Sequence, residues 1–278
     1  IRSSLLRRIW LSMLRGYQAA PPLAPRVPTA QAEDIATLAT FREGTPEGFA
    51  RLDAACKAAQ VTVGGALLAA TWFGLARLIC DQRGAPPRRL TIDVDVDLRA
   101  QVQPRAPDTH VGFYTGQSDI GGRVAPTSDF WDVARRLRGQ TTTALRFGLA
   151  ELVHLMPEDI PDYFAYVEAR GVSRHGAGGT GSLAAVSNVG RFPYEARRGP
   201  LRLTGLWGMN GACLLGPALI PWLRWVDGRL FYNAIASSPA VDQAQLERFQ
   251  DAIFALLEDP PAARSLSIQG FCAREGRP

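Results

Sequence analysis

Two small polar residues and a glycine stand at the end of a short apolar run in the second half of the chain. Residues 183–186 are Leu-Ala-Ala-Val, which is typical of a buried strand, and Ser187, Asn188 and Gly190 follow. The serine hydroxyl and the asparagine amide each donate and accept hydrogen bonds, and a glycine lets a ligand or another backbone come close. The pattern predicts a strand that opens into a polar site, with these three residues binding a ligand.

A glycine-rich segment lies just before this strand. Residues 176–181 match the pattern G-x-G-x-x-G, which is known from dinucleotide-binding proteins. That fingerprint follows a strand and opens a helix, so that phosphate sits on the helix N-terminus. Here a helical segment, Asp162 to Arg170, comes before the glycines and a strand comes after them. We therefore favour a surface loop over a phosphate cradle.

Three aspartates alternate with apolar residues in the run Leu90 to Leu98. In a strand, Asp93, Asp95 and Asp97 share one face at a spacing of about 7 Å. A metal or acid–base site is one interpretation. A solvated face or partners for arginines is the interpretation we favour, so we predict no metal site. Arg99 stands on the same face at the strand end, where its guanidinium can pair with a carboxylate from another element.

No histidine has the spacing of a metal or catalytic motif. His110, His154 and His175 form neither H-E-x-x-H nor H-x-H, and the chain has no G-x-S-x-G elbow. His154 lies in an apolar run and is expected to be structural. A catalytic role for His110 remains an alternative. The residues alone thus indicate a polar strand mouth without an obvious general base.

Composition excludes some classes of function. The 278 residues carry a net charge of +5, and of 31 basic residues Lys57 is the single lysine. The arginines are scattered and form no block with aromatic residues, so we expect no nucleic-acid partner. No stretch has the roughly 18 uninterrupted apolar residues of a membrane span. The four cysteines contain no C-x-x-C pair: Cys56, Cys80, Cys213 and Cys272. Cys56 and Cys80 lie in apolar helical patterns and are interpreted as buried thiols, and a reducing, cytoplasmic setting is expected.

The first 40 residues differ from the rest. Residues 1–18 carry apolar side chains at four-residue spacing, which predicts an amphipathic helix, and a proline-rich linker follows at 21–28. We favour packing of this helix on the protein over binding to a membrane surface. Because the chain opens on Ile1 and not on Met, we expect that further residues precede it. Residues 1–40 are therefore assigned to a helix and linker, and residues 41–278 to one globular lobe.

Local signals in that lobe indicate alternating helices and strands. Thr45 before Pro46 and Thr62 before an apolar run are helix starts, and Asp242 with Gln245 forms a capping box. Asp227-Gly228 is a hairpin turn. The order predicts an α/β fold. Helices are expected at 46–60, 63–83, 127–147, near 150 and 162, and after 242, and strands at 90–98, 183–189, 201–208, 219–226, 230–236 and around 266.

Four segments follow one another along the chain: TPEGFARLDAACKAAQVTVGGALLAATWFGLARL, LTIDVDVDLR, SLAAVSNVGRF and VDGRLFYNAIASSPAVDQAQLERFQDAI. In this order they resemble the C-terminal half of the CoA-dependent acyltransferase superfamily. This superfamily includes condensation domains, alcohol acetyltransferases and polyketide-associated acyltransferases. The resemblance implies a chloramphenicol-acetyltransferase-like lobe, with a mixed β-sheet flanked by helices. It also implies a second, N-terminal lobe and a tunnel between the two lobes.

The resemblance also implies roles for individual residues. Arg99 matches the strand-end arginine that, in similar enzymes, pairs with the aspartate of a His-His-x-x-x-Asp motif and holds its loop. Ser187 and Asn188 match a Ser-Asn pair beside the tunnel that orients substrate or steadies the oxyanion, and Gly190 allows close approach. The pair at 207–208, Trp-Gly, falls near a late glycine-bearing motif, but Thr-Gly-Leu-Trp-Gly departs from Asp-Phe-Gly-Trp-Gly, so packing is the alternative.

The expected function follows from what this chain shares with the family and what it lacks. The chain has no His-His-x-x-x-Asp motif, and loss of a general base lowers a rate by about 10²–10⁴. We expect the C-terminal lobe of an acyltransferase that moves an acyl group from CoA or a carrier protein to an alcohol or amine. It would need its N-terminal lobe and no cofactor besides the thioester substrate. A non-catalytic binding or scaffold module is the alternative. A half-enzyme would also leave an exposed apolar patch.

Overall fold

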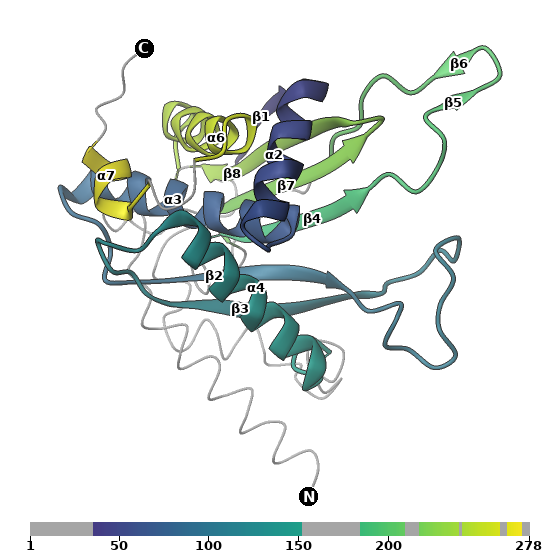
Figure 1. The fold of residues 1–278 in the computed structure, drawn as a ribbon, viewed down its shortest axis with the longest axis horizontal. Helices are drawn as coiled ribbons and strands as arrows, with labels where there is room; N and C mark the ends of the chain where they lie inside the picture. The colour runs from purple at the N-terminus through teal and green to yellow at the C-terminus, as the bar shows by residue number, and fades with distance from the viewer. Residues whose placement is uncertain (1–35, 152–183, 209–216, 239–240, 262–265, 274–278) are drawn as a thin grey trace, which may run out of the picture.

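Six strands form one mixed sheet in the order β1-β8-β7-β4-β2-β3, with helices packed against it (Figure 1). The computed structural model describes residues 36–151, 184–208, 217–238, 241–261 and 266–273. The mixed sheet flanked by helices confirms the predicted fold class. The sheet strands are β1 Ala36–Glu43, β2 Arg89–Asp97, β3 Thr115–Arg123, β4 Ala185–Arg191, β7 Leu219–Val226 and β8 Arg229–Ser238, and a separate hairpin is formed by β5 Arg197–Arg198 and β6 Leu201–Arg202.

The helices begin where local capping signals place them. Thr45 and Thr62 accept hydrogen bonds from the backbone nitrogens of Gly48 and Gly65, at 3.0 and 3.1 Å. The capping box of Asp242 and Gln245 is present. These predicted starts are confirmed, whereas the helix expected from residue 127 begins later, after the cap of Asp129. The helices are α2 Pro46–Ala58, α3 Val63–Arg83, α4 Phe130–Arg146, α6 Gln243–Glu258 and α7 Ile268–Ala273.

Helix α3 is the centre of the hydrophobic core. It is apolar nearly all round, and side chains such as Leu67, Trp72, Leu75 and Ile79 are buried. It packs against α4, α6 and α7 as well as the sheet. Its length and hydropathy would suffice for a membrane span, but 78% of that stretch is buried in the fold, as expected of a core helix.

The two faces of the sheet differ in chemistry because side chains alternate along each strand. Ile92 and Val94 of β2 and Val186 of β4 belong to the same core cluster as the helices. Asp93 and Asp95, which alternate with them, point to the opposite face. The predicted aspartate face of β2 is therefore the face that the helices do not cover, and the apolar face of the same strand is buried against them.

The sequence did not indicate β1, β3 or the short β5, and two predicted strands are wrong. β3 has the poor strand formers TGQSDIGGR. The strand expected around 266 is only an isolated bridge between Ser267 and Asp129, directly before α7. Of the strand expected at 201–208, only Leu201 and Arg202 pair, within the β5–β6 hairpin. The chain then leaves the strand conformation, and the Trp207 ring packs edge-on against Phe231, at 5.1 Å between centroids.

Several predictions concern segments outside the described residues. They are the amphipathic helix at 1–18, the proline-rich linker at 21–28, the helix at 162–170 and the glycine-rich segment at 176–181.

Candidate functional site

The sheet splits between its two central parallel strands. β2 and β4 pair only at Asp93–Ala185 and Val94–Val186. Beyond these two pairs, β2 pairs only with β3, up to the end of β2 at Asp97, and β4 pairs only with β7. A cleft of about 480 Å³ lies at the split. Ligands of open α/β sheets bind outside the carboxyl ends of the strands, where neighbouring connections diverge, and this cleft has that position.

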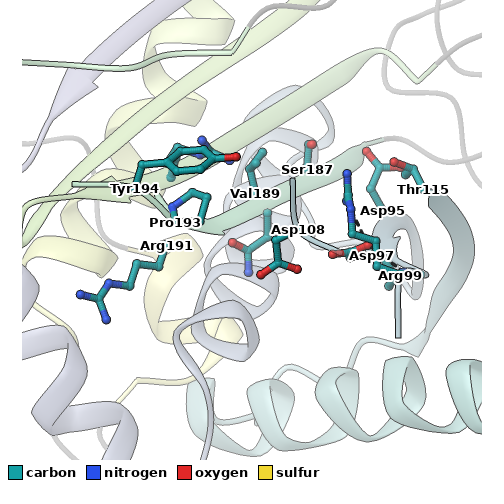
Figure 2. A pocket seen from close by; sticks show the side chains of 13 residues that line it. Asp95, Asp97, Arg99, Asp108, Thr115, Ser187, Val189, Arg191, Pro193 and Tyr194 are labelled. Atoms are coloured by element: carbon teal, nitrogen blue, oxygen red, sulfur yellow. Dashed lines mark hydrogen bonds and ion pairs between the residues drawn. The ribbon is translucent and has the colours of Figure 1, made fainter. Parts of the chain in front are cut away.

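The cleft is lined by charged and polar side chains from both sides of the split (Figure 2). Three aspartates and three arginines face it, so its formal charges balance. The polar residues predicted from the two separate strand ends thus lie in one site. The charged lining consists of Asp95, Asp97, Asp108, Arg99, Arg191 and Arg224, and Thr115, Ser187, Asn188, Val189, Pro193 and Tyr194 are among the other lining residues.

Ser187 and Asp95 face each other across the split. The ladder register, continued past its last pair, places them opposite one another, and the Ser187 hydroxyl hydrogen-bonds to the Asp95 carboxylate. The side-chain nitrogen Nε2 of Gln117 donates to Oδ1 of Asp95 at 3.3 Å. Burial raises the pKa of Asp95 above its ordinary value, and the two hydrogen bonds oppose this shift. Ser187 therefore has a partner already and must turn from it to donate to a ligand.

Asn188 shapes the strand end through its own side chain. Its Oδ1 accepts a hydrogen bond from the backbone nitrogen of Gly190 at 3.1 Å. The register between β4 and β7 shifts at this point, and Gly190 has a φ of +74°, which favours glycine. The side-chain nitrogen of Asn188 lies so close to Gly64, in the first turn of α3, that an added Cβ there would come within 2.6 Å of it. Asn188 thus joins the bulge to the start of α3.

Arg99 lies just beyond the end of β2 and is held by its neighbours. Its Nη1 donates to Oδ1 of Asp97 at 3.2 Å, and its Nη2 donates to the backbone oxygen of His110 at 3.3 Å. The guanidinium stacks over the Tyr114 ring at 4.9 Å from the centroid. Among the described residues its buried Nε has no hydrogen-bond partner. Arg99 therefore has one buried donor without a partner in the described structure, while the rest of its guanidinium lines the cleft.

Arg224 is a site residue that the sequence reasoning did not single out. It lines the cleft from β7, and its guanidinium lies over the Phe192 ring at 5.6 Å from the centroid. Burial lowers the pKa of Arg224, and its Nε has no hydrogen-bond partner among the described residues. An arginine inside the otherwise apolar run LIPWLRWV was the signal that could have identified it.

Within the described part of the chain, no histidine lines the cleft and no group of His, Cys, Asp and Glu is arranged to hold a metal ion. His110 lies in the loop between β2 and β3, where its backbone and not its ring contacts Arg99. His154 and His175 are outside the described residues. The cleft as described can bind and orient a polar ligand through hydrogen bonds and charge.

The mixed sheet flanked by helices is the fold of known condensation domains and acyltransferases. Residues 45–207, more than half of the chain, match the family described as phthiocerol/phthiodiolone dimycocerosyl transferase C-terminus. The chain belongs to this family, and the resemblance stated from the sequence is confirmed. No curated protein matches the chain.

Solved structures support the fold. The polyketide synthase associated protein 5 from Mycobacterium tuberculosis has a TM-score of 0.57 and 14% identity, over 92% of this chain and 61% of that one. The condensation domain of the Monacolin K polyketide synthase MokA has a TM-score of 0.64 and 13% identity, over 92% and 57%.

The TRI3 trichothecene 15-O-acetyltransferase from Fusarium sporotrichioides has a TM-score of 0.62 and 10% identity, over 92% of this chain and 52% of that one. At these identities the structures show a shared fold and not a shared substrate. This chain spans between half and two thirds of the length of the three structures.

Proposed function

We propose that this chain is the C-terminal lobe of an acyltransferase that moves an acyl group from a thioester to an alcohol or amine. The donor would be acyl-CoA or an acyl carrier protein, and the catalytic histidine motif would come from an N-terminal lobe outside this chain. The observation that carries the proposal is the cleft at the β2–β4 split, where Ser187 and Arg99 lie together in a member of the transferase C-terminus family.

Arg99 has the geometry that such a role requires. Its contacts with Asp97 and His110 use Nη1 and Nη2, while Nε is buried without a partner in the described structure. The Arg99 side chain lines the cleft and is partly exposed, so a carboxylate arriving from a second lobe would form a charge-assisted pair with the accessible part of the guanidinium. We assign Arg99 to holding the histidine loop of that lobe and not to contact with substrate.

We assign Ser187 to direct contact with the substrate. Its hydroxyl stands in the cleft and, after release from Asp95, can donate a hydrogen bond to the oxyanion that forms when a thioester is attacked. Asn188 and Gly190 would act indirectly, because their mutual hydrogen bond sets the shape of the strand end that carries Ser187.

Exposed apolar side chains also agree with a lobe that meets another surface. Val189 and Tyr194 line the cleft and are exposed, and Val111 and Phe113 are exposed on the loop that also carries Arg99. That loop and the β5–β6 hairpin both project beyond the same end of the sheet (Figure 1). Large exposed apolar side chains on neighbouring segments are typical of interaction surfaces.

The test is acyl transfer from acetyl-CoA to a medium-chain alcohol, measured by release of the free thiol. The chain would be assayed alone and joined to the N-terminal half of a related acyltransferase that carries His-His-x-x-x-Asp. We expect activity only in the joined protein. Activity of the chain alone would contradict the assignment of the base to another lobe. Inactivity of both, with both folded, would favour a non-catalytic binding module.

Variants of the joined protein test the two site residues. Ser187→Ala should lower kcat by about 10²–10³, the usual effect of losing one oxyanion donor. Arg99→Ala should also lower activity, whereas Arg248→Ala, an exposed arginine on α6, is the matched control and should leave it unchanged. Full activity of Arg99→Ala would show that this residue does not hold the histidine loop.

A further inference from the structure

Two cysteines that are far apart in the sequence lie side by side where α7 packs on α3. Cys80 is near the end of α3 and Cys272 is in α7. Both are free thiols, both are half-buried, and their side chains are within hydrogen-bonding reach of each other. Figure 1 shows α7 next to one end of α3.

The packing of the two helices fixes this neighbourhood. The rings of Phe73 and Phe271 meet edge-on at 5.6 Å between centroids, and Nη1 of Arg77 donates to the backbone oxygen of Phe271 at 3.1 Å. Phe73, Arg77 and Cys80 are spaced four and three residues apart, so they lie along one face of α3. Cys80 comes next along that face of α3, and Cys272 comes directly after Phe271 in α7, where its side chain interacts with Cys80.

We propose that Cys80 and Cys272 are a redox-modification site, which closes to a disulfide in the presence of a small disulfide oxidant such as oxidised glutathione. The bond fastens the C-terminal helix to the core helix. In a reducing cytoplasm the pair stays as two thiols, and it closes when the thiol pool becomes oxidised.

The reaction balances in two exchange steps. The thiolate of one cysteine attacks a sulfur of oxidised glutathione, forms a mixed disulfide and releases one glutathione thiolate. The thiolate of the other cysteine then attacks the protein sulfur of the mixed disulfide and releases the second glutathione. Two protein thiols are oxidised, one glutathione disulfide is reduced to two thiols, and the two protons pass to the released thiolates.

The surroundings set the rate of this reaction. Burial, together with the neighbouring Cys80 and Asp81, raises the pKa of the Cys272 thiol to about 12, and Arg77 opposes the shift. Because the thiolate is the attacking species, closure should be slow at neutral pH and accelerate as the pH rises. Cys56 is an internal control, since it is buried and burial with the charge of Asp53 raises its pKa to about 12.

The test uses the full chain, incubated with excess oxidised glutathione at mildly alkaline pH and then alkylated. Intact mass should show the loss of two hydrogen atoms, peptide mapping should show a Cys80–Cys272 link, and dithiothreitol should reverse both. The melting temperature should rise on oxidation, because the bond closes a long loop in the unfolded chain.

Single variants separate this bond from other cysteine chemistry. Cys80→Ser and Cys272→Ser should each abolish the link, whereas Cys56→Ser and Cys213→Ser should retain it. The proposal is wrong if the native chain takes up one glutathione on each of Cys80 and Cys272 without linking them. It is also wrong if Cys213 replaces either partner, or if both thiols stay free while the urea-unfolded chain is oxidised.

Discussion

The bulge at Gly190 allows one change in the cleft wall to be predicted in both sign and size. In Gly190→Ala the new Cβ would meet only Cη2 of Trp225, at 4.0 Å, so there is no clash. The cost lies in the backbone, because φ is +74° and a left-handed conformation costs a residue with a Cβ about 1–2 kcal/mol. Lower entropy of the unfolded chain offsets about 0.4–1 kcal/mol. We expect a net loss of about 1 kcal/mol.

Gly139→Ala is a matched control with the opposite sign. Gly139 lies inside α4, and an added Cβ would have no atom within 4 Å. Here the substitution removes flexibility without strain, so the free energy of unfolding should rise by about 0.5–1 kcal/mol. Gly190→Asn should recover part of the loss seen with alanine, because asparagine tolerates a positive φ.

Urea unfolding followed by circular dichroism measures all three variants against the wild type, with the slope m used to check that the unfolded state is unchanged. Wild-type stability of Gly190→Ala, or a shift of both alanine variants in the same direction, would contradict the expected backbone cost at Gly190. A change in m for Gly190→Ala alone would show that the bulge affects more than its own backbone.

Three further changes test other parts of the fold. Burial raises the pKa of Asp95, so the charged carboxylate destabilises the folded state as the pH rises. The stability of Asp95→Asn should therefore exceed that of the wild type by more at about pH 7 than at about pH 4, and an equal difference at both would contradict this. Gly74→Ala places a Cβ 2.8 Å from Cγ1 of Ile253, and overpacking should cost about 1–3 kcal/mol in urea unfolding, whereas a neutral result would mean that α6 moves freely. Asp242→Ala removes the α6 cap and should lower the free energy of unfolding by about 1 kcal/mol, unless water replaces the cap.

Features that depend on residues close together in the chain could be predicted from the sequence. The caps at Thr45, Thr62 and Asp242 and the turn at Asp227-Gly228, whose φ values are +51° and +74°, are formed by residues within one turn of each other. The alternation in β2 is equally local. A pattern of apolar residues reports which face of an element is buried, and it needs no knowledge of what covers that face.

Strand ends that rely on distant partners were less predictable. The run at 201–208 alternates like a strand, yet after Arg202 the chain turns to pack Trp207 on Phe231, which no local signal shows. The converse holds for β3, where three glycines and several polar residues form a full strand because β2 pairs with it along its whole length. Strand pairing is a tertiary contact, and it overrides weak propensity.

The sequence also identified Ser187, Asn188, Gly190 and Arg99 as candidate site residues, from their types and from the resemblance to the acyltransferase superfamily. Their arrangement was decided by the tertiary structure. Only the separation of β2 from β4 turns two strand ends into one cleft, and only that geometry sets Ser187 against Asp95. The physical reason is that side-chain chemistry and local periodicity are properties of neighbouring residues. Which distant residues meet depends instead on how the whole chain buries its apolar surface.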